Sequence, residues 1–304
     1  MANLMWTSVY AITFLAVATI FKFLHCDEIE RHLLEDQRIL YVSDNRKHIA
    51  RNWKLAYVHI PKTGGTSMED SSLFDRKRKL GMAPRSHFSV RALRNASNVE
   101  NFLFATHIRH PCERFVSAFL YLRYDPRAKG MQELANQYGI MDFRNVEDFI
   151  DWLDVNQFWT LLLTGSLFHF RPMFYWIVDD CSDSFGIDLV MCQDYWQDGI
   201  HDLALYLKMQ HIPRNLFAKK RVNFLHNSSC IEMDDKYSQA IVQKYSLDAC
   251  LFGYDEFGEG KFEILHRNRS RCIGSEFNKS WFTERLHFCK ASLGISLGCD
   301  DLAD

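Results

Sequence analysis

The feature that most constrains the fold is a short strand that runs directly into a glycine turn and then into a helix. Residues 55–60 are mostly apolar and rich in β-forming side chains, which predicts a buried strand. Pro61 ends this strand, and the pair Gly64-Gly65 permits a tight turn. The Thr-Ser pair that follows is placed to cap a helix reaching to about residue 74.

The same alternation of strand and helix continues along the chain. Further strands are predicted over 101–108 and 187–192, and helical segments over 112–124, 131–163, 194–209 and 234–245. Strands that alternate with helices favour a parallel sheet covered by helices, in a single α/β domain. Ligands of such sheets bind at the carboxyl ends of the strands, where the Pro-containing turns lie.

The turn after the first strand has the chemistry of an anion site. Backbone N–H groups at the start of a helix favour a phosphate-like group, and Lys62 adds a positive charge. The lysine precedes the glycines, unlike that of nucleoside triphosphatases, and no Mg²⁺-binding Ser/Thr follows it in the usual register. A Mg²⁺-dependent kinase is therefore a poor fit. The alternative is a structural turn without a ligand.

A second motif follows the second strand, over residues 109–117. Arg109 at the strand end and Ser117 two helical turns later are spaced to hold one phosphate between a guanidinium and a hydroxyl. Glu113 and Arg114 lie between them, and their alternative role is surface ion pairing.

The N-terminal segment favours a membrane anchor. Residues 6–21 are uncharged, and the apolar run extends to residue 24 if Lys22 snorkels to the interface, which suffices for a short span. Ala16-Val17-Ala18 also fits the cleavage site of a signal peptide, the alternative. We expect a cytoplasmic tip and signal-anchor helix over 1–24, a stem over 25–50, a catalytic domain over 51–258 and a Cys-containing extension over 259–304 packed on that domain.

The cysteines agree with a secretory route. None of the nine cysteines has Cys-x-x-Cys spacing, so we expect disulfides rather than a metal site. Six of them follow residue 190, which predicts that the tail is cross-linked to the domain. Acceptor sequons for glycosylation begin at Asn95, Asn227, Asn268 and Asn278.

The net charge of −2 conceals a basic stretch. Residues 76–94 hold seven Lys or Arg and no acidic residue, which favours an electropositive cleft wall, with a solvated face as the alternative.

Together, the Pro-Lys-Thr-Gly-Gly-Thr-Ser loop and the Arg-x-Pro-x-x-Arg-x-x-Ser segment resemble the sulfotransferases that use 3′-phosphoadenosine-5′-phosphosulfate (PAPS). The likeness covers roughly residues 53–255 and is greatest to the Golgi carbohydrate group that includes heparan and uronyl 2-O-sulfotransferases. His110 stands where that family often has Asp, and Cys112 where an apolar residue is common.

The resemblance implies a P-loop-like parallel sheet and specific ligands. It implies that Arg109 and Ser117 bind the 3′-phosphate. The loop would cradle the 5′-phosphosulfate through Lys62, Thr63, Gly64, Gly65, Thr66 and Ser67. It also implies a single-pass type II protein of the Golgi membrane with a lumenal catalytic domain. We expect a glycan acceptor, no metal and no nucleic-acid partner.

Sulfuryl transfer to a sugar hydroxyl needs a base, and the resemblance favours His87, which lies at a comparable distance before the 3′-phosphate segment. Lys62 would stabilise the charge that develops on the sulfate. The alternatives for the base are His59, His107, His110 and Glu69.

The basic stretch suggests an anionic, glycosaminoglycan-like acceptor. Candidate acceptor-binding residues are Arg85, Arg91, His169 and Arg171, the last two being surface residues in the alternative interpretation. Two other functions are open: an inactive lumenal protein that binds the nucleotide or glycan, and a phosphotransferase. The sequence leaves open the acceptor sugar and sulfated position, the use of the sequons, the disulfide pairs and the oligomeric state.

Overall fold

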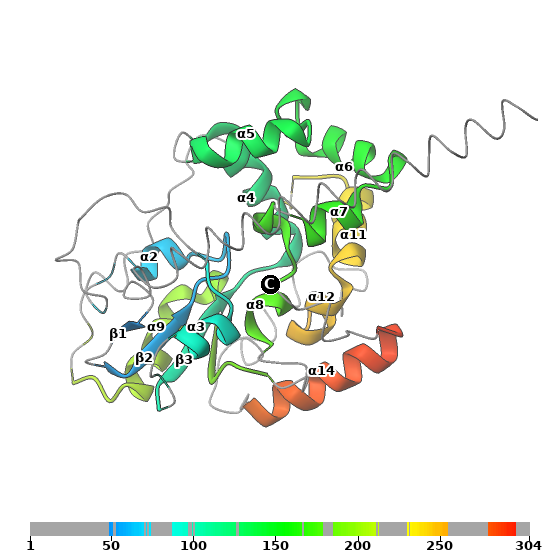
Figure 1. Ribbon diagram of the computed structural model, residues 1–304. Coiled ribbons are helices and arrows are strands. Elements are labelled where there is room, and N and C mark those ends of the chain that lie inside the picture. The colour runs from blue at the N-terminus through cyan, green and yellow to red at the C-terminus, as the bar shows by residue number, and fades with distance from the viewer. Residues whose placement is uncertain are drawn as a thin grey trace, which may run out of the picture. The chain divides into compact units, whose positions relative to one another are not determined.

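A four-stranded sheet in the order β1-β2-β3-β4 positions the loops of interest (Figure 1). Strands β2 (Leu55–Val58), β3 (Leu103–Ile108) and β4 (Leu189–Cys192) are parallel, and the short β1 (Ile49–Ala50) pairs antiparallel with β2. Thr106 in β3 lies opposite Val58 on one side and Val190 on the other. The loops after β2, β3 and β4 therefore leave the same edge of the sheet.

The computed structural model describes residues 49–50, 53–69, 71, 73, 87–96, 99, 101–125, 128–165, 167–178, 185–210, 212, 230, 232–254 and 279–295. The helices of these residues are α2 (Gly65–Glu69), α3 (Val90–Ala96), α4 (Pro111–Tyr124), α5 (Lys129–Gln137), η4 (Ile140–Asp142), α6 (Val146–Val155), α7 (Trp159–Thr164), η5 (Phe168–Phe170), α8 (Phe174–Ile177), η6 (Gln193–Tyr195), α9 (Trp196–Tyr206), α11 (Asp235–Lys244), α12 (Ser246–Phe252) and α14 (Lys279–Leu293).

Helices cover both faces of the sheet, as expected for parallel strands. On one face, Leu55, Tyr57 and Met191 pack with Trp196 and Ile200 of α9. Helix α3 contacts β2, and the guanidinium of Arg94 lies 4.8 Å from the ring centroid of Phe104 in β3. The predicted α/β architecture with a small parallel sheet flanked by helices is thus confirmed.

A second core is entirely helical and extends from α4. Phe115 and Phe119 of α4 pack with Phe149 of α6, Trp159 of α7 and Tyr245 after α11. This core fixes the axis of α4, and α4 begins directly after the carboxyl end of β3. The second motif is therefore held in place by the packing of α4 against these helices.

Several element boundaries differ from prediction for local reasons. Helix α2 begins at Gly65, because the turn is completed at Gly64 (φ 96°), so the Thr-Ser pair lies inside the helix instead of capping it. The helical region expected over 131–163 is divided: Gly139 (φ 68°) ends α5, and Gln157 (φ 55°) separates α6 from α7. Asn145 caps α6 by accepting a bond from the backbone N–H of Asp148 (2.8 Å).

The ends of the chain are described only in part. Residues 1–24, where we expect an anchor helix, and residues 25–48 of the stem lie outside the described residues. No helix within the described ranges is long and apolar enough to span a bilayer. Near the C-terminus, the disulfide Cys250–Cys289 joins α12 to α14, and Figure 1 shows the two helices close together.

Candidate active site

The loop after β2 has two residues in the left-handed backbone region. Lys62 has φ 68° and Gly64 has φ 96°. A lysine rarely adopts this conformation, and its cost of about 1 kcal/mol is met where the surrounding structure holds the residue in place. The backbone N–H of Ser67 donates to the carbonyl of Gly64 (2.9 Å), which closes the turn into α2.

Gly65 lets the loop lie in close contact with the His59 ring. A Cβ atom at Gly65 would overlap the His59 imidazole, so any larger residue must displace the ring or the loop. The ring is fixed in turn, because His59 Nδ1 lies 2.6 Å from Glu69 Oε1 at the end of α2. His59 and Glu69 thus bond to each other beneath the loop, an arrangement that orients it.

His87 is held by the backbone of the same loop. Its Nδ1 lies 2.9 Å from the carbonyl oxygen of His59, and a carbonyl can only accept, so Nδ1 carries the proton. In the neutral ring Nε2 is then the basic atom. The imidazole of His87 also stands edge-on to that of His59, with centroids 4.3 Å apart.

Lys62 reaches over α4. Its Nζ lies 4.1 Å from the ring centroid of Tyr121, and the same ring lies next to His169, with ring centroids 4.9 Å apart. His169 lies 5.6 Å from His87 by ring centroids. Lys62, His87 and His169, three residues predicted for the site, are therefore neighbours, although 107 positions separate the first from the last.

His169 is a buried, neutral hydrogen-bonding group. Burial lowers the pKa of His169 well below 6.5, and the neighbouring His87 and Lys62 lower it further. Its Nδ1 is buried and has no hydrogen-bond partner within the part of the chain that the structure describes. An unpaired buried polar atom costs about 1–3 kcal/mol, and a bound ligand is one explanation for it.

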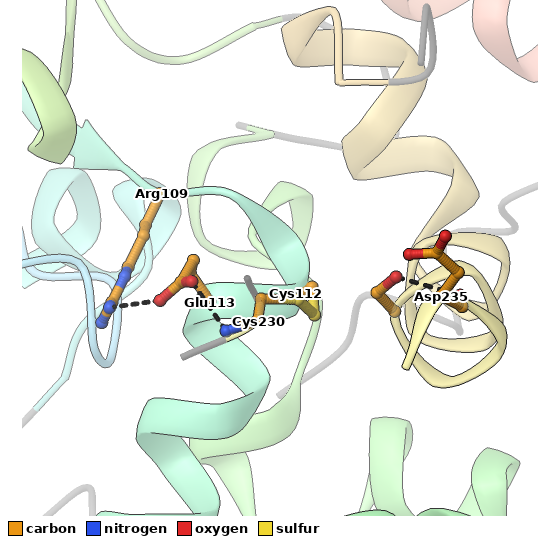
Figure 2. Close-up of a disulfide and its surroundings, with 6 residues drawn as sticks. Arg109, Cys112, Glu113, Cys230 and Asp235 are labelled. Atoms are coloured by element: carbon orange, nitrogen blue, oxygen red, sulfur yellow. Dashed lines mark hydrogen bonds and ion pairs between the residues drawn. A yellow bond between two sulfur atoms is a disulfide. The ribbon is translucent and has the colours of Figure 1, made fainter. Parts of the chain in front are cut away.

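Arg109 connects the second motif to the loop, and Figure 2 shows its pairing with Glu113. Its Nη1 donates to the carbonyl of Lys62 (3.4 Å), and its Nη2 pairs with Glu113 Oε2 (3.1 Å). The buried Nε of Arg109 has no hydrogen-bond partner among the described residues. Ser117 lies one turn beyond Glu113 on α4 and is half-buried.

Arg114 is not a surface residue. It is fully buried and donates to the backbone carbonyls of His169 (3.0 Å), Phe170 (3.4 Å) and Arg171. These bonds fix the segment that carries His169. The alternative of surface ion pairing is therefore wrong for Arg114, and Glu113 is mostly buried, at 16% side-chain exposure.

The remaining predicted site residues differ in their surroundings. The hydroxyl of Thr63 is buried and donates to the carbonyl of Ile60 (2.9 Å), so it stabilises the loop from within. Thr66 and Ser67 lie in the first turn of α2. Arg91 is exposed on α3, and Arg171 Nε donates to the carbonyl of Gly165 (3.3 Å). Arg85 lies outside the described residues.

Two other histidines considered as bases, His107 and His110, have surroundings that suit a structural role. The ring of His107 stacks on Trp196, with centroids 4.3 Å apart, and its Nδ1 lies 3.0 Å from the hydroxyl of Tyr57. Burial and the adjacent Arg109 lower the pKa of His110 to about 4. These surroundings favour His87 over both.

Sequence reasoning missed Tyr121 and the role of Glu113. Helical periodicity contains a signal for both, since Glu113, Ser117 and Tyr121 follow at intervals of four on α4. Sequence reasoning also missed the contact between the loop and α9: a Cβ atom on Gly64 would lie 3.1 Å from Cζ3 of Trp196. That contact joins residues far apart in sequence, and no local pattern indicates it.

Comparison with known proteins agrees with this geometry. A family model described as the sulfotransferase family matches residues 46–255, more than half of the chain. Neither the curated proteins nor the solved structures contain a significant match. The matched range includes the loop after β2, the Arg109 motif and His169. The chain therefore belongs to the sulfotransferase family.

Proposed function

We propose that this protein transfers a sulfuryl group from PAPS to a hydroxyl of a glycan. The observation that carries the proposal is the position of His87. A carbonyl of the loop strand fixes its Nδ1 proton, which leaves Nε2 basic beside the loop that holds Lys62. The family assigns the transferred group, and a fixed base beside an anion-binding loop suits a hydroxyl nucleophile.

The described residues suit an anionic donor. The loop, Lys62 and Arg109 lie together at the carboxyl edge of the sheet, where two parallel strands end. Two buried nitrogens there, Nε of Arg109 and Nδ1 of His169, have no hydrogen-bond partner among the described residues. When bound, PAPS would supply the sulfuryl group and a phosphate leaving group.

Each residue then has a distinct role. His87 Nε2 accepts the proton of the acceptor hydroxyl, and Lys62 neutralises negative charge that develops during transfer. Arg109 and Ser117 hold the donor's 3′-phosphate, which contributes orientation. His169 stays neutral at pH 7, so it adds a hydrogen bond without adding a charge beside Lys62.

The acceptor we propose is an anionic, glycosaminoglycan-like chain. The support is the basic composition of residues 76–94, which include Arg85 and Arg91, together with the further positive charge of Arg171. A Golgi location with a lumenal domain and an N-terminal signal-anchor belongs to the same proposal. The two disulfides between described residues support it, because such bonds form and persist in oxidising compartments.

Transfer of radiolabelled sulfate tests the function. The domain from about residue 45 would be incubated with PAPS labelled in the sulfuryl group and with heparan, chondroitin and dermatan chains, their desulfated forms and neutral glycans. We expect label in at least one anionic chain. Binding of the desulfonated nucleotide (PAP) with no transfer to any glycan would contradict catalysis and favour a nucleotide-binding protein.

A further inference from the structure

Glu113 uses both carboxylate oxygens to join two parts of the chain (Figure 2). Oε2 pairs with Nη2 of Arg109 at 3.1 Å, and Oε1 accepts the backbone N–H of Cys230 at 2.8 Å. Its side chain is 16% exposed and that of Arg109 is 19% exposed, so water competes weakly for these bonds.

The Arg109 end of this network leads to the loop. Nη1 of Arg109 donates to the carbonyl of Lys62 over 3.4 Å, a long bond that can hold the Lys62 carbonyl only if Arg109 is itself held in place. Lys62 is also in the left-handed backbone region. Its conformation therefore depends on neighbours such as Arg109, and the orientation of Arg109 depends on Glu113.

The other end leads to a disulfide. Cys230 is bonded to Cys112, the residue before Glu113, and 118 positions separate the two cysteines. The disulfide holds their Cα atoms 5.9 Å apart, which places the backbone N–H of Cys230 against the Glu113 carboxylate. Without the cross-link, that bond would have to form between segments that are distant in sequence.

The charge of Glu113 argues against direct contact with the donor. A carboxylate beside an anion-binding site repels the anion, unless its charge is engaged in fixing the cation that binds it. Both oxygens of Glu113 have such partners. A neutral residue could not orient a guanidinium as strongly.

We propose that Glu113 and the Cys112–Cys230 disulfide form a positioning network for the donor site. The disulfide places the N–H of Cys230, that N–H and Arg109 fix Glu113, and Arg109 is thereby aimed at the 3′-phosphate while it holds the Lys62 carbonyl. Glu113 is a positioning residue, not a catalytic one. This inference rests on the proposed function, since the ligand is PAPS.

The test measures the Kd of PAP by titration calorimetry and the kinetics of transfer for matched variants. Glu113→Ala should raise the Kd for PAP about tenfold, the loss of about 1.4 kcal/mol of binding, while kcat at saturating PAPS changes less than about threefold. Glu113→Gln keeps an acceptor oxygen, so it should fall between wild type and Glu113→Ala.

The second disulfide provides the control. Cys112→Ser/Cys230→Ser should raise the Kd for PAP about five- to tenfold, whereas Cys250→Ser/Cys289→Ser should leave it within about twofold. Because the network acts as one unit, adding Glu113→Ala to Cys112→Ser/Cys230→Ser should raise the Kd little further. Purely structural damage would instead give additive losses.

The outcomes separate this inference from the function on which it depends. If the wild-type protein binds no PAP, the proposed donor is wrong. If the wild type binds PAP and a folded Glu113→Ala variant binds it equally well, the donor stands and the positioning network is wrong. Equal losses in both double-cysteine variants would also overturn the network. If Cys112→Ser/Cys230→Ser does not fold, the two Glu113 variants, which keep the Cys112–Cys230 disulfide, decide the matter.

Discussion

The side chains around the loop differ in charge and in hydrogen-bonding capacity. His87 has a fixed tautomer because a carbonyl oxygen faces its Nδ1, whereas Lys62 carries a charge over the face of Tyr121. His169 is neutral, because burial lowers its pKa and Lys62 and the other basic groups nearby lower it further. A proton acceptor, a cation and a neutral hydrogen-bonding group are thus present within one group of residues.

These differences predict separable kinetic effects. His87→Ala should lower kcat by about 10²–10⁴ and leave the Kd for PAP within about twofold, because a base acts on the acceptor and not on the nucleotide. Lys62→Ala should lower kcat/KM for PAPS by a similar factor. Stopped assays with PAPS and calorimetry with PAP check both. Near-normal turnover of a folded His87→Ala variant would remove His87 from its role.

Gly65 gives a steric prediction. Gly65→Ala should destabilise the fold by about 1–3 kcal/mol and weaken PAP binding, because its Cβ overlaps the His59 ring. The control is Gly130→Ala in α5, where a Cβ atom meets nothing within 4 Å and helix propensity favours alanine by up to about 1 kcal/mol. Urea unfolding compares the two. If Gly65→Ala is as stable as the wild type, the His59 ring moves aside without a cost in free energy.

At the scale of elements, α8 depends on a buried acid from α12. Asp248 is fully buried and accepts bonds from the backbone N–H groups of Met173 (2.6 Å) and Phe174 (2.9 Å) at the start of α8. Burial raises the pKa of Asp248 from 3.8 to about 6, although Arg114 and the two N–H groups oppose the shift. The ionised form is therefore costly in the folded state.

This shift predicts the pH dependence of stability. Between about pH 4 and 6 the folded protein binds a proton at Asp248 that the unfolded chain does not, so this group's contribution to stability grows as pH falls through that range. Asp248→Asn should remove that contribution and cost about 1–3 kcal/mol at pH 7, since the amide loses one acceptor. Urea unfolding between pH 4 and 7 measures the free energy of unfolding of both proteins, with Asp142→Asn, a change at an exposed residue, as the control. If this free energy varies with pH in the same way in the wild type and in Asp248→Asn, the prediction is wrong.

At the scale of the whole molecule, the disulfides Cys112–Cys230 and Cys250–Cys289 have different roles. Cys112–Cys230 lies beside the donor-binding motif, whereas Cys250–Cys289 attaches α14 to α12. Helix α14 also packs through Phe282 against Phe185, with ring centroids 4.4 Å apart. Its attachment therefore concerns stability rather than the site.

The tail cross-link predicts a loss of stability without a loss of binding. Cys250→Ser/Cys289→Ser should lower the free energy of unfolding by about 2–4 kcal/mol, because the bond closes a loop between residues 39 positions apart. Limited proteolysis should then cut within or before α14 first. Thermal melts and protease mapping of oxidised protein check this, and an unchanged melting temperature would show that apolar packing alone holds the helix.

The amino-acid sequence by itself determined the elements that depend only on residues near each other in the chain. An apolar run bounded by Pro61 and the glycine pair specifies a strand and a turn, because both depend on residues within a few positions of each other. The same holds for β3 and the start of α4 at Pro111. The identities of Lys62, Arg109 and His87 as site candidates came from these local motifs and from the family likeness.

The tertiary structure alone decided which distant residues meet. The partners Arg114–His169, Glu113–Cys230 and Lys62–Tyr121 are 55 to 117 positions apart. Periodicity shows that a face is buried but does not name what covers it, so the burial of Arg114 and the bond between Glu113 and Cys230 could not be predicted. The shape of the loop after β2 is thus decided locally, whereas its function depends on contacts with Arg109 and Tyr121 that only the tertiary structure supplies.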